Sequence, residues 1–130
     1  MKLETVTELE EKILATEELL ETFRVKAKAA GTSKIDGQPH GQATASRVET
    51  LTVKIVDTEK ELADLREEYK TTVLNLSRAI DQRVKGRAAT VLYFHYVMRE
   101  PFAEIANLMN LSQSQISRLH RQGRKEFYGQ

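Results

Sequence analysis

One short stretch near the end of the chain carries side chains that could recognise another molecule. From Ser112 to Lys125 there are four basic residues and no acidic one, whereas a helix that only meets water usually mixes charges of both signs. Amide and guanidinium groups can form hydrogen bonds with base edges, and basic side chains bind phosphates. These residue types therefore favour recognition of nucleic acid. The simpler alternative is a basic face that is merely solvated.

The order of the polar residues along this stretch predicts a role for each. Short polar side chains at the exposed start of a helix, with basic ones in its later turns, are typical of a helix that lies in the major groove of DNA. We therefore expect base contacts from Gln113, Ser114, Ser117 and Arg118. We expect phosphate contacts from Arg121, Arg124 and Lys125, and from Arg87, near the start of an earlier helix.

Two short helices and a tight turn must position these side chains. Apolar residues recur at steps of three and four in residues 102–109, and a second inward series consists of Ile116, Leu119, Gly123 and Phe127. Ser112 and Gln115 have the spacing of a capping box, which begins a helix. Only Asn110 and Leu111 lie between the helices, so we expect a positive φ at Asn110, which asparagine tolerates well. The segment from Pro101 to Phe127 is therefore predicted to be a helix-turn-helix.

The segment EIANLMNLSQSQISRLH resembles the last promoter-reading domain of bacterial sigma factors. The matching core consists of Glu104, Ile105, Ala106, Met109, Asn110, Leu111, Ser112, Ile116 and Leu119. The whole chain resembles small phage and prophage regulators, including late-gene activators of the ArpU and RinA type. This resemblance implies DNA binding and activation of late genes. Two residues depart from the pattern, since Pro101 replaces a capping Ser or Thr and Gly123 replaces a better helix former, which leaves the end of the last helix open.

The first two thirds of the chain predict two long helices. Apolar residues recur at steps of mostly three and four from Val6 to Ala30 and again from Val48 to Ile80, as in the seam of a coiled coil. The segment between them, GTSKIDGQPHGQ, is predicted to be a loop, so the helices should lie antiparallel. Gly86 is then expected to be a hinge or the start of a supporting helix that contains Val91 and Leu92.

Both long helices also carry apolar residues outside the seam, and a single hairpin would leave these exposed. They are Leu14, Leu19, Val25, Val53, Val56, Ala63 and Leu74. We therefore expect the hairpins of two chains to associate. A homodimer suits DNA, because two linked modules bind two half-sites.

Charge separates the chain into two parts near residue 83. Residues 1–83 hold 13 basic and 16 acidic residues, a net charge of −3, whereas residues 84–130 hold 7 and 3, a net charge of +4. This asymmetry favours a nucleic-acid partner for the second part. The sequence thus predicts an all-α protein with two domains, a helical hairpin for oligomerisation in residues 1–82 and a sigma-factor-like DNA-binding domain in residues 83–130.

The composition argues against other classes of protein. The chain has no cysteine, its histidines at 40, 95 and 120 lack the spacing of a metal site, and no glycine-rich phosphate loop occurs. We found no pair of nucleophile and base, so we expect no catalytic residue, no cofactor and no enzymatic activity. No apolar run approaches the ~20 residues that span a bilayer. We expect a cytoplasmic protein of a bacterial host cell.

The sequence therefore predicts a DNA-binding transcriptional regulator that acts as a homodimer on double-stranded DNA and contacts it through residues 112–127. Two alternatives remain open. One is a DNA-recognising assembly protein such as a small terminase subunit, and the other is a coiled-coil adaptor that contacts RNA polymerase.

Overall fold

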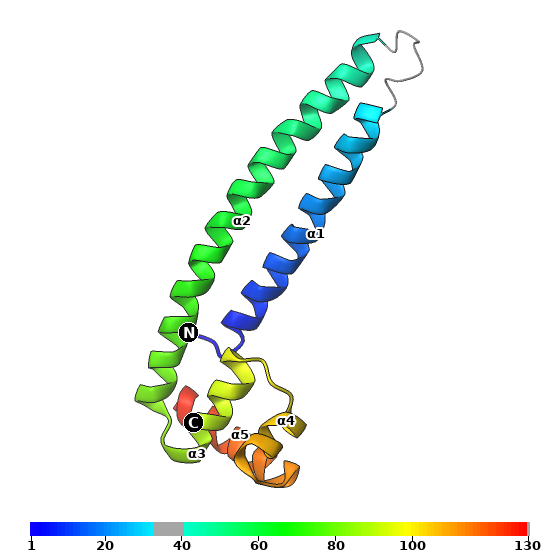
Figure 1. Ribbon diagram of the computed structural model, residues 1–130. Helices are drawn as coiled ribbons and strands as arrows, with labels where there is room; N and C mark the ends of the chain where they lie inside the picture. The colour runs from blue at the N-terminus through cyan, green and yellow to red at the C-terminus, as the bar shows by residue number, and fades with distance from the viewer. Residues whose placement is uncertain (33–40, 130) are drawn as a thin grey trace. The chain divides into compact units, whose positions relative to one another are not determined.

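The structure, a computed structural model, describes residues 1–32 and 41–129, and the side chains of residues 1–30 and 46–129. These residues form helices joined by short connections, and no strand occurs among them (Figure 1). The elements are α1 (Thr5–Thr32), α2 (Gly41–Arg83), α3 (Gly86–Leu92), the π-helical turn η2 (Tyr93–Val97), α4 (Phe102–Met109) and α5 (Gln113–Tyr128). The predicted all-α class is confirmed. Residues 33–40, the central part of the predicted loop, lie outside the described residues.

The chain divides into two units by its contacts. The hairpin unit is Glu11–Glu67, and the head unit combines Met1–Glu10 with Glu68–Gln130. The head unit therefore contains residues from both sides of the predicted boundary at residue 83. The reason is packing, since Leu3 and Ile80 are buried in one cluster with apolar residues of α3 and α5.

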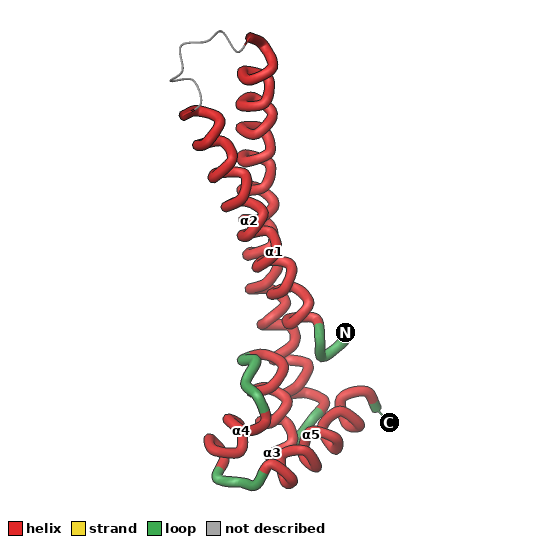
Figure 2. Tube along the Cα trace, turned by 90° about the vertical axis from the view of Figure 1, so that its right-hand side faces the viewer, coloured by secondary structure: helices red, strands yellow, loops and turns green. Residues whose placement is uncertain are grey.

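In the hairpin unit α1 and α2 lie side by side and antiparallel (Figures 1 and 2). Two ion pairs fix the direction, because Arg66 contacts Glu17 at 3.2 Å and Arg24 contacts Glu59 at 3.9 Å. The residue nearer the start of α1 thus pairs with the residue nearer the end of α2. The predicted pair of long antiparallel helices is confirmed.

The predicted seams face inward. Every described seam residue of the hairpin unit is buried or partly buried, including Thr16, whose hydroxyl donates to the backbone carbonyl of Lys12 at 2.8 Å. This bond explains how a polar residue occupies an apolar seam. The aliphatic residues outside the seam are exposed, with Leu19 at 46% and Val56 at 60%. Over the described ranges, the helices lack an apolar stretch of the length that crossing a membrane requires.

The head unit is built around α3 and η2, which carry apolar residues on two faces. One face holds Ala88 and Leu92 in a cluster with the start of the chain, the end of α2, and Phe127 of α5. The other face holds Val91, which packs with Ile105 and Ile116 of the helix-turn-helix. Leu119 packs against both clusters. The supporting helix therefore joins α5 to the rest of the head unit.

Both ends of this supporting helix depend on unusual backbone angles. Gly86 begins α3 with φ = 67°, in agreement with its predicted place at the helix start. At the other end, Arg99 has φ = 58°, and the Glu100 amide donates to the Phe94 carbonyl at 2.9 Å. A left-handed residue followed by this long backbone bond is a common way to end a helix. The π-helical turn and the angle at Arg99 were not predicted from the sequence.

Candidate nucleic-acid interface

The turn between α4 and α5 has the predicted local structure. Asn110 ends α4 in the left-handed conformation with φ = 55° and ψ = 45°. Ser112 then caps α5, because its hydroxyl accepts from the Gln115 amide at 3.1 Å, and the Gln115 side chain accepts from the Ser112 amide at 2.9 Å. Both bonds of the capping box are therefore present. The turn and the cap together fix the direction in which α5 leaves α4.

The inward side of α5 anchors it to the head unit. Ile116 and Phe127 are fully buried, and Gly123 between them is buried as well. A Cβ atom at Gly123 would lie 2.9 Å from the Leu92 Cγ and 3.2 Å from the Ala88 carbonyl oxygen. Only glycine thus permits this approach of α5 to α3. The helix continues past Gly123 to Tyr128, which settles where the last helix ends.

The opposite side of α5 presents most of the predicted contact residues to solvent. Gln113, Ser114, Arg118, Arg121 and Lys125 are exposed, and Ser117 is partly buried. Arg87 is also exposed, but it lies in the first turn of α3. α5 therefore brings the four predicted base-contact residues together at its start, with Arg121 and Lys125 in the turns that follow.

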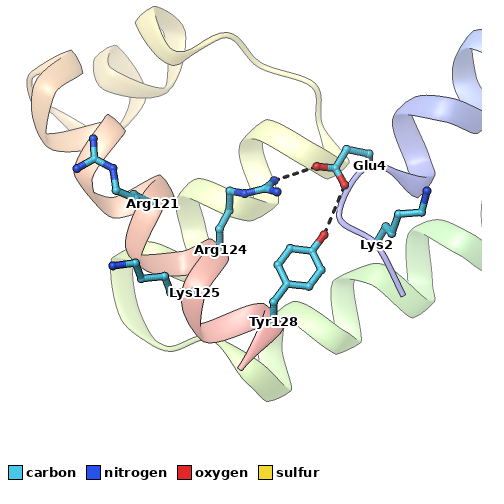
Figure 3. A pocket seen from close by; sticks show the side chains of 6 residues that line it. All are labelled: Lys2, Glu4, Arg121, Arg124, Lys125 and Tyr128. Carbon is cyan, nitrogen blue, oxygen red and sulfur yellow. Dashed lines mark hydrogen bonds and ion pairs between the residues drawn. The ribbon is translucent and has the colours of Figure 1, made fainter. Parts of the chain in front are cut away.

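Arg124 differs from the other predicted phosphate contacts because it already has partners within the head unit. Its Nη1 donates to the Glu4 carboxylate at 2.9 Å (Figure 3). The same Nη1 donates to the Tyr96 hydroxyl at 2.7 Å. The same ion pair lowers the pKa of Glu4 and raises the pKa of Arg124. Arg124 is thus a residue that joins α5 to the start of the chain, a role that its sequence position did not reveal.

A chain of hydrogen bonds continues from Arg124 into the head unit. The Tyr96 hydroxyl lies 2.6 Å from the His120 Nε2. Because the Tyr96 oxygen already accepts from Arg124, its O–H can donate a hydrogen bond to Nε2 of a neutral His120. Burial lowers the pKa of His120 from 6.5 to about 4, and nearby His95 and Arg124 act in the same direction. Burial also raises the pKa of Tyr96. His120 is therefore neutral near pH 7 and is the last residue of the hydrogen-bonded chain that runs from Glu4 through Arg124 and Tyr96.

The two histidines of the head unit lie together, although the sequence places them in separate helices. The rings of His95 and His120 are 5.4 Å apart, and Phe102 lies within 5.0 Å of both ring centres. The Nδ1 of His95 is 3.0 Å from the Glu100 carbonyl oxygen. Across the described part of the chain, no three His, Asp or Glu side chains gather as metal ligands would. The two imidazole rings therefore pack against each other and against Phe102.

α5 combines an exposed polar and basic side with a buried apolar side. The start of α5 offers amide, hydroxyl and guanidinium groups to solvent, and the helix behind them is held by a cap and by buried apolar residues. A rigid helix with exposed donors is suited to reading groups at fixed spacing.

No known protein family matches this chain, and comparisons with curated proteins and with solved structures likewise found no match. The function is therefore argued from the geometry of α5 and its surroundings.

Proposed function

We propose that the protein is a sequence-specific DNA-binding transcriptional regulator that places α5 in the major groove. The observation that carries this proposal is the exposure of Gln113, Ser114 and Arg118 at the capped start of a helix whose other side is buried. Glutamine suits adenine and arginine suits guanine, because each pair forms two parallel hydrogen bonds. The base contacts would come from Gln113, Ser114, Ser117 and Arg118.

Exposed cations beyond these residues support a set of phosphate contacts. Arg121 and Lys125 follow the base-contact residues along the same helix, and both are exposed. Arg87 is exposed on α3 and would reach a neighbouring phosphate. Such contacts supply most of the affinity for DNA and little of the sequence preference. Arg124 would position this surface, since its guanidinium holds Glu4.

The hairpin unit supports a dimeric regulator. Its exposed aliphatic residues include Leu14, Leu19 and Val25 on α1 and Val53 and Val56 on α2. Pairing two hairpins would remove these side chains from water and carry two DNA-binding modules on one particle. Two half-sites would then be read together, as in other regulators built on a helix-turn-helix.

Binding to short DNA duplexes tests the proposal. Fluorescence anisotropy with a duplex selected from random sequence should show tight binding that weakens with salt. Arg118→Ala should cost about 1–3 kcal/mol and relax the preference at one or two base pairs. Arg121→Ala should instead weaken binding to all duplexes by a similar factor. Lys60→Ala removes an exposed charge from the hairpin unit and serves as the control.

Three experimental results would contradict this proposal. If the Arg118 and Arg121 variants bound DNA like the parent, α5 would not be the helix that reads DNA. If the protein bound no duplex but bound RNA polymerase, the adaptor function would take its place. A ring of many subunits in mass measurements would favour a packaging protein of the small terminase kind.

A further inference from the structure

A pocket of about 580 Å³ lies beside the second half of α5, against the beginning of the chain. Figure 3 shows the side chains that line it: Lys2, Glu4, Arg121, Arg124, Lys125 and Tyr128. Four of these side chains are basic and one is acidic, so the walls carry a net charge of about +3. A concave surface with charge of one sign concentrates ions of the opposite sign. The pocket is therefore suited to an anion.

The charges of Arg124 and Glu4 largely compensate each other. The positive charges of Lys2, Arg121 and Lys125 are not compensated by another residue that lines the pocket. Arg124 and Glu4 form a direct ion pair at 2.9 Å, and the Tyr128 hydroxyl donates to the same carboxylate at 3.4 Å. Among the described residues, neither Arg121 nor Lys125 forms an ion pair. Lys2 makes only a loose contact with Glu8 at 3.6 Å, with both side chains more than half exposed. An exposed pair of this kind contributes little and exchanges partners easily.

The cations outside the Arg124–Glu4 pair come from two sides of the pocket. Arg121 and Lys125 are four residues apart on α5, so they lie on one face of the helix, one turn from each other. Lys2 lies in the segment that precedes α1. The Glu4 contact with Arg124, together with the bond from the Leu3 amide to the Tyr128 hydroxyl at 3.0 Å, holds this segment against α5. The ion pair therefore holds Lys2 at the side of the pocket across from the two cations of the helix, with Arg124 and Tyr128 between them (Figure 3).

We propose that this pocket seats the phosphate backbone of DNA, with Lys2 on one side, Arg121 and Lys125 on the other, and the Arg124–Glu4 pair as its floor. The proposal rests on the proposed function and extends it, because it brings the beginning of the chain into the DNA interface. DNA is the occupant that the position favours, since the pocket adjoins the turns of α5 that follow the base-contact residues. Its phosphates are spaced regularly along the same groove.

Removal of the Lys2 charge tests this site without touching α5. The full chain with Lys2→Gln should bind the selected duplex severalfold more weakly than the parent. The slope of log affinity against log salt should decrease by about 1, the value expected for one lost phosphate contact. Lys12→Gln removes an equally exposed lysine from the hairpin unit and should leave both quantities unchanged. Circular dichroism of each variant checks that the helices remain.

A combination of variants distinguishes this site from a general charge effect. Lys2 and Lys125 lie on two sides of the pocket and would contact separate phosphates, so the salt slope of the double variant Lys2→Gln/Lys125→Gln should decrease by about 2. A Lys2→Gln protein with the parent's affinity and salt slope would overturn the pocket and leave the proposed function standing. Equal losses for Lys12→Gln would also overturn it. A parent protein that bound no duplex would overturn both proposals.

Discussion

The head unit and the hairpin unit differ in how completely they bury their apolar residues. The ten largest fully buried side chains all lie in the head unit: Phe127, Leu3, Leu76, Ile80, Leu92, Ile105, Ile116, Val6, Val84 and Val91. In the hairpin unit the most buried residues, Leu20 and Leu62, are each 5% exposed. Five Leu and Val side chains of that unit are about half exposed, and four charged side chains form its ion pairs.

This difference means that the two units are stabilised to different degrees by their own apolar cores. Burial of apolar area is the main favourable term in folding, so the head unit holds its shape by its own core. A two-helix hairpin has one narrow seam and gains further burial only from a partner. The head unit can thus hold α5 rigidly, while the hairpin unit leaves several aliphatic side chains exposed to solvent.

Truncation of one phenylalanine in each unit should show the largest difference between the two cores in the free energy of unfolding. Phe127 is 2% exposed, and Phe127→Ala should lower the free energy of unfolding by about 3–5 kcal/mol. Phe23 is only partly buried, so Phe23→Ala should cost clearly less. Urea unfolding followed by tyrosine fluorescence reports on the head unit, because all four tyrosines lie there; circular dichroism reports on both units. Equal losses in the two variants would remove the distinction.

A valine at Gly123 should be the next most damaging change. The Cβ atom would press on Leu92 and on the Ala88 backbone, and crowding of this kind costs typically 1–3 kcal/mol. Gln122→Val places the same side chain at an exposed neighbouring position and serves as the control. Thermal unfolding should show a lower midpoint for the Gly123 variant alone. If the two variants melted together, α3 and α5 would not be in close contact.

The sequence predicted features that depend on residues close together in the chain. The seams follow from helical spacing, the positive φ of Asn110 from a two-residue turn, and the capping box from the spacing of Ser112 and Gln115. These features rest on local geometry, which a single sequence contains. For the same reason, the exposed face of α5 follows from its buried face.

The features that were missed depend on residues far apart in the chain. Glu4 meets Arg124 across 120 positions, and Tyr96 of η2 meets His120 and Arg124 of α5 only in the folded head unit. No periodicity or motif marks such a contact. The sequence placed Gly123 in the inward series, but the need for glycine at this position comes from the close approach of α3. The angle at Arg99 is likewise set by how η2 meets the chain that follows.

Acid should weaken the head unit. The folded state lowers the pKa of His120 from 6.5 to about 4 and also lowers the pKa of Glu4, so both groups favour their deprotonated forms when folded. The contribution of His120 is complete above pH 6.5 and is lost as the pH falls toward 4, whereas that of Glu4 is lost only below pH 4.5. Urea unfolding at several pH values should show this decline, and His120→Gln, which keeps an acceptor for Tyr96, should flatten it. A decline of the same size in His120→Gln would exclude His120 as its cause.

The smallest effect on folding, and the clearest effect on assembly, is expected from the exposed aliphatic residues of the hairpin unit. Leu19→Ser and Val56→Ser should change the free energy of unfolding of a single chain by less than about 0.5 kcal/mol. The double variant should nevertheless shift the protein toward the mass of one chain in sedimentation experiments, because the apolar surface would be lost. A mass equal to that of the parent would place the association surface elsewhere.

The proposed function requires that the exposed start of α5 reads a DNA sequence. Selection of bound duplexes from a random pool, carried out in parallel with the parent and with Arg118→Ala, is the decisive experiment. We expect one enriched motif with two symmetric half-sites, and a loss of preference at one or two base pairs of each half-site in the variant. A pool without an enriched motif, or the same motif from both proteins, would contradict it.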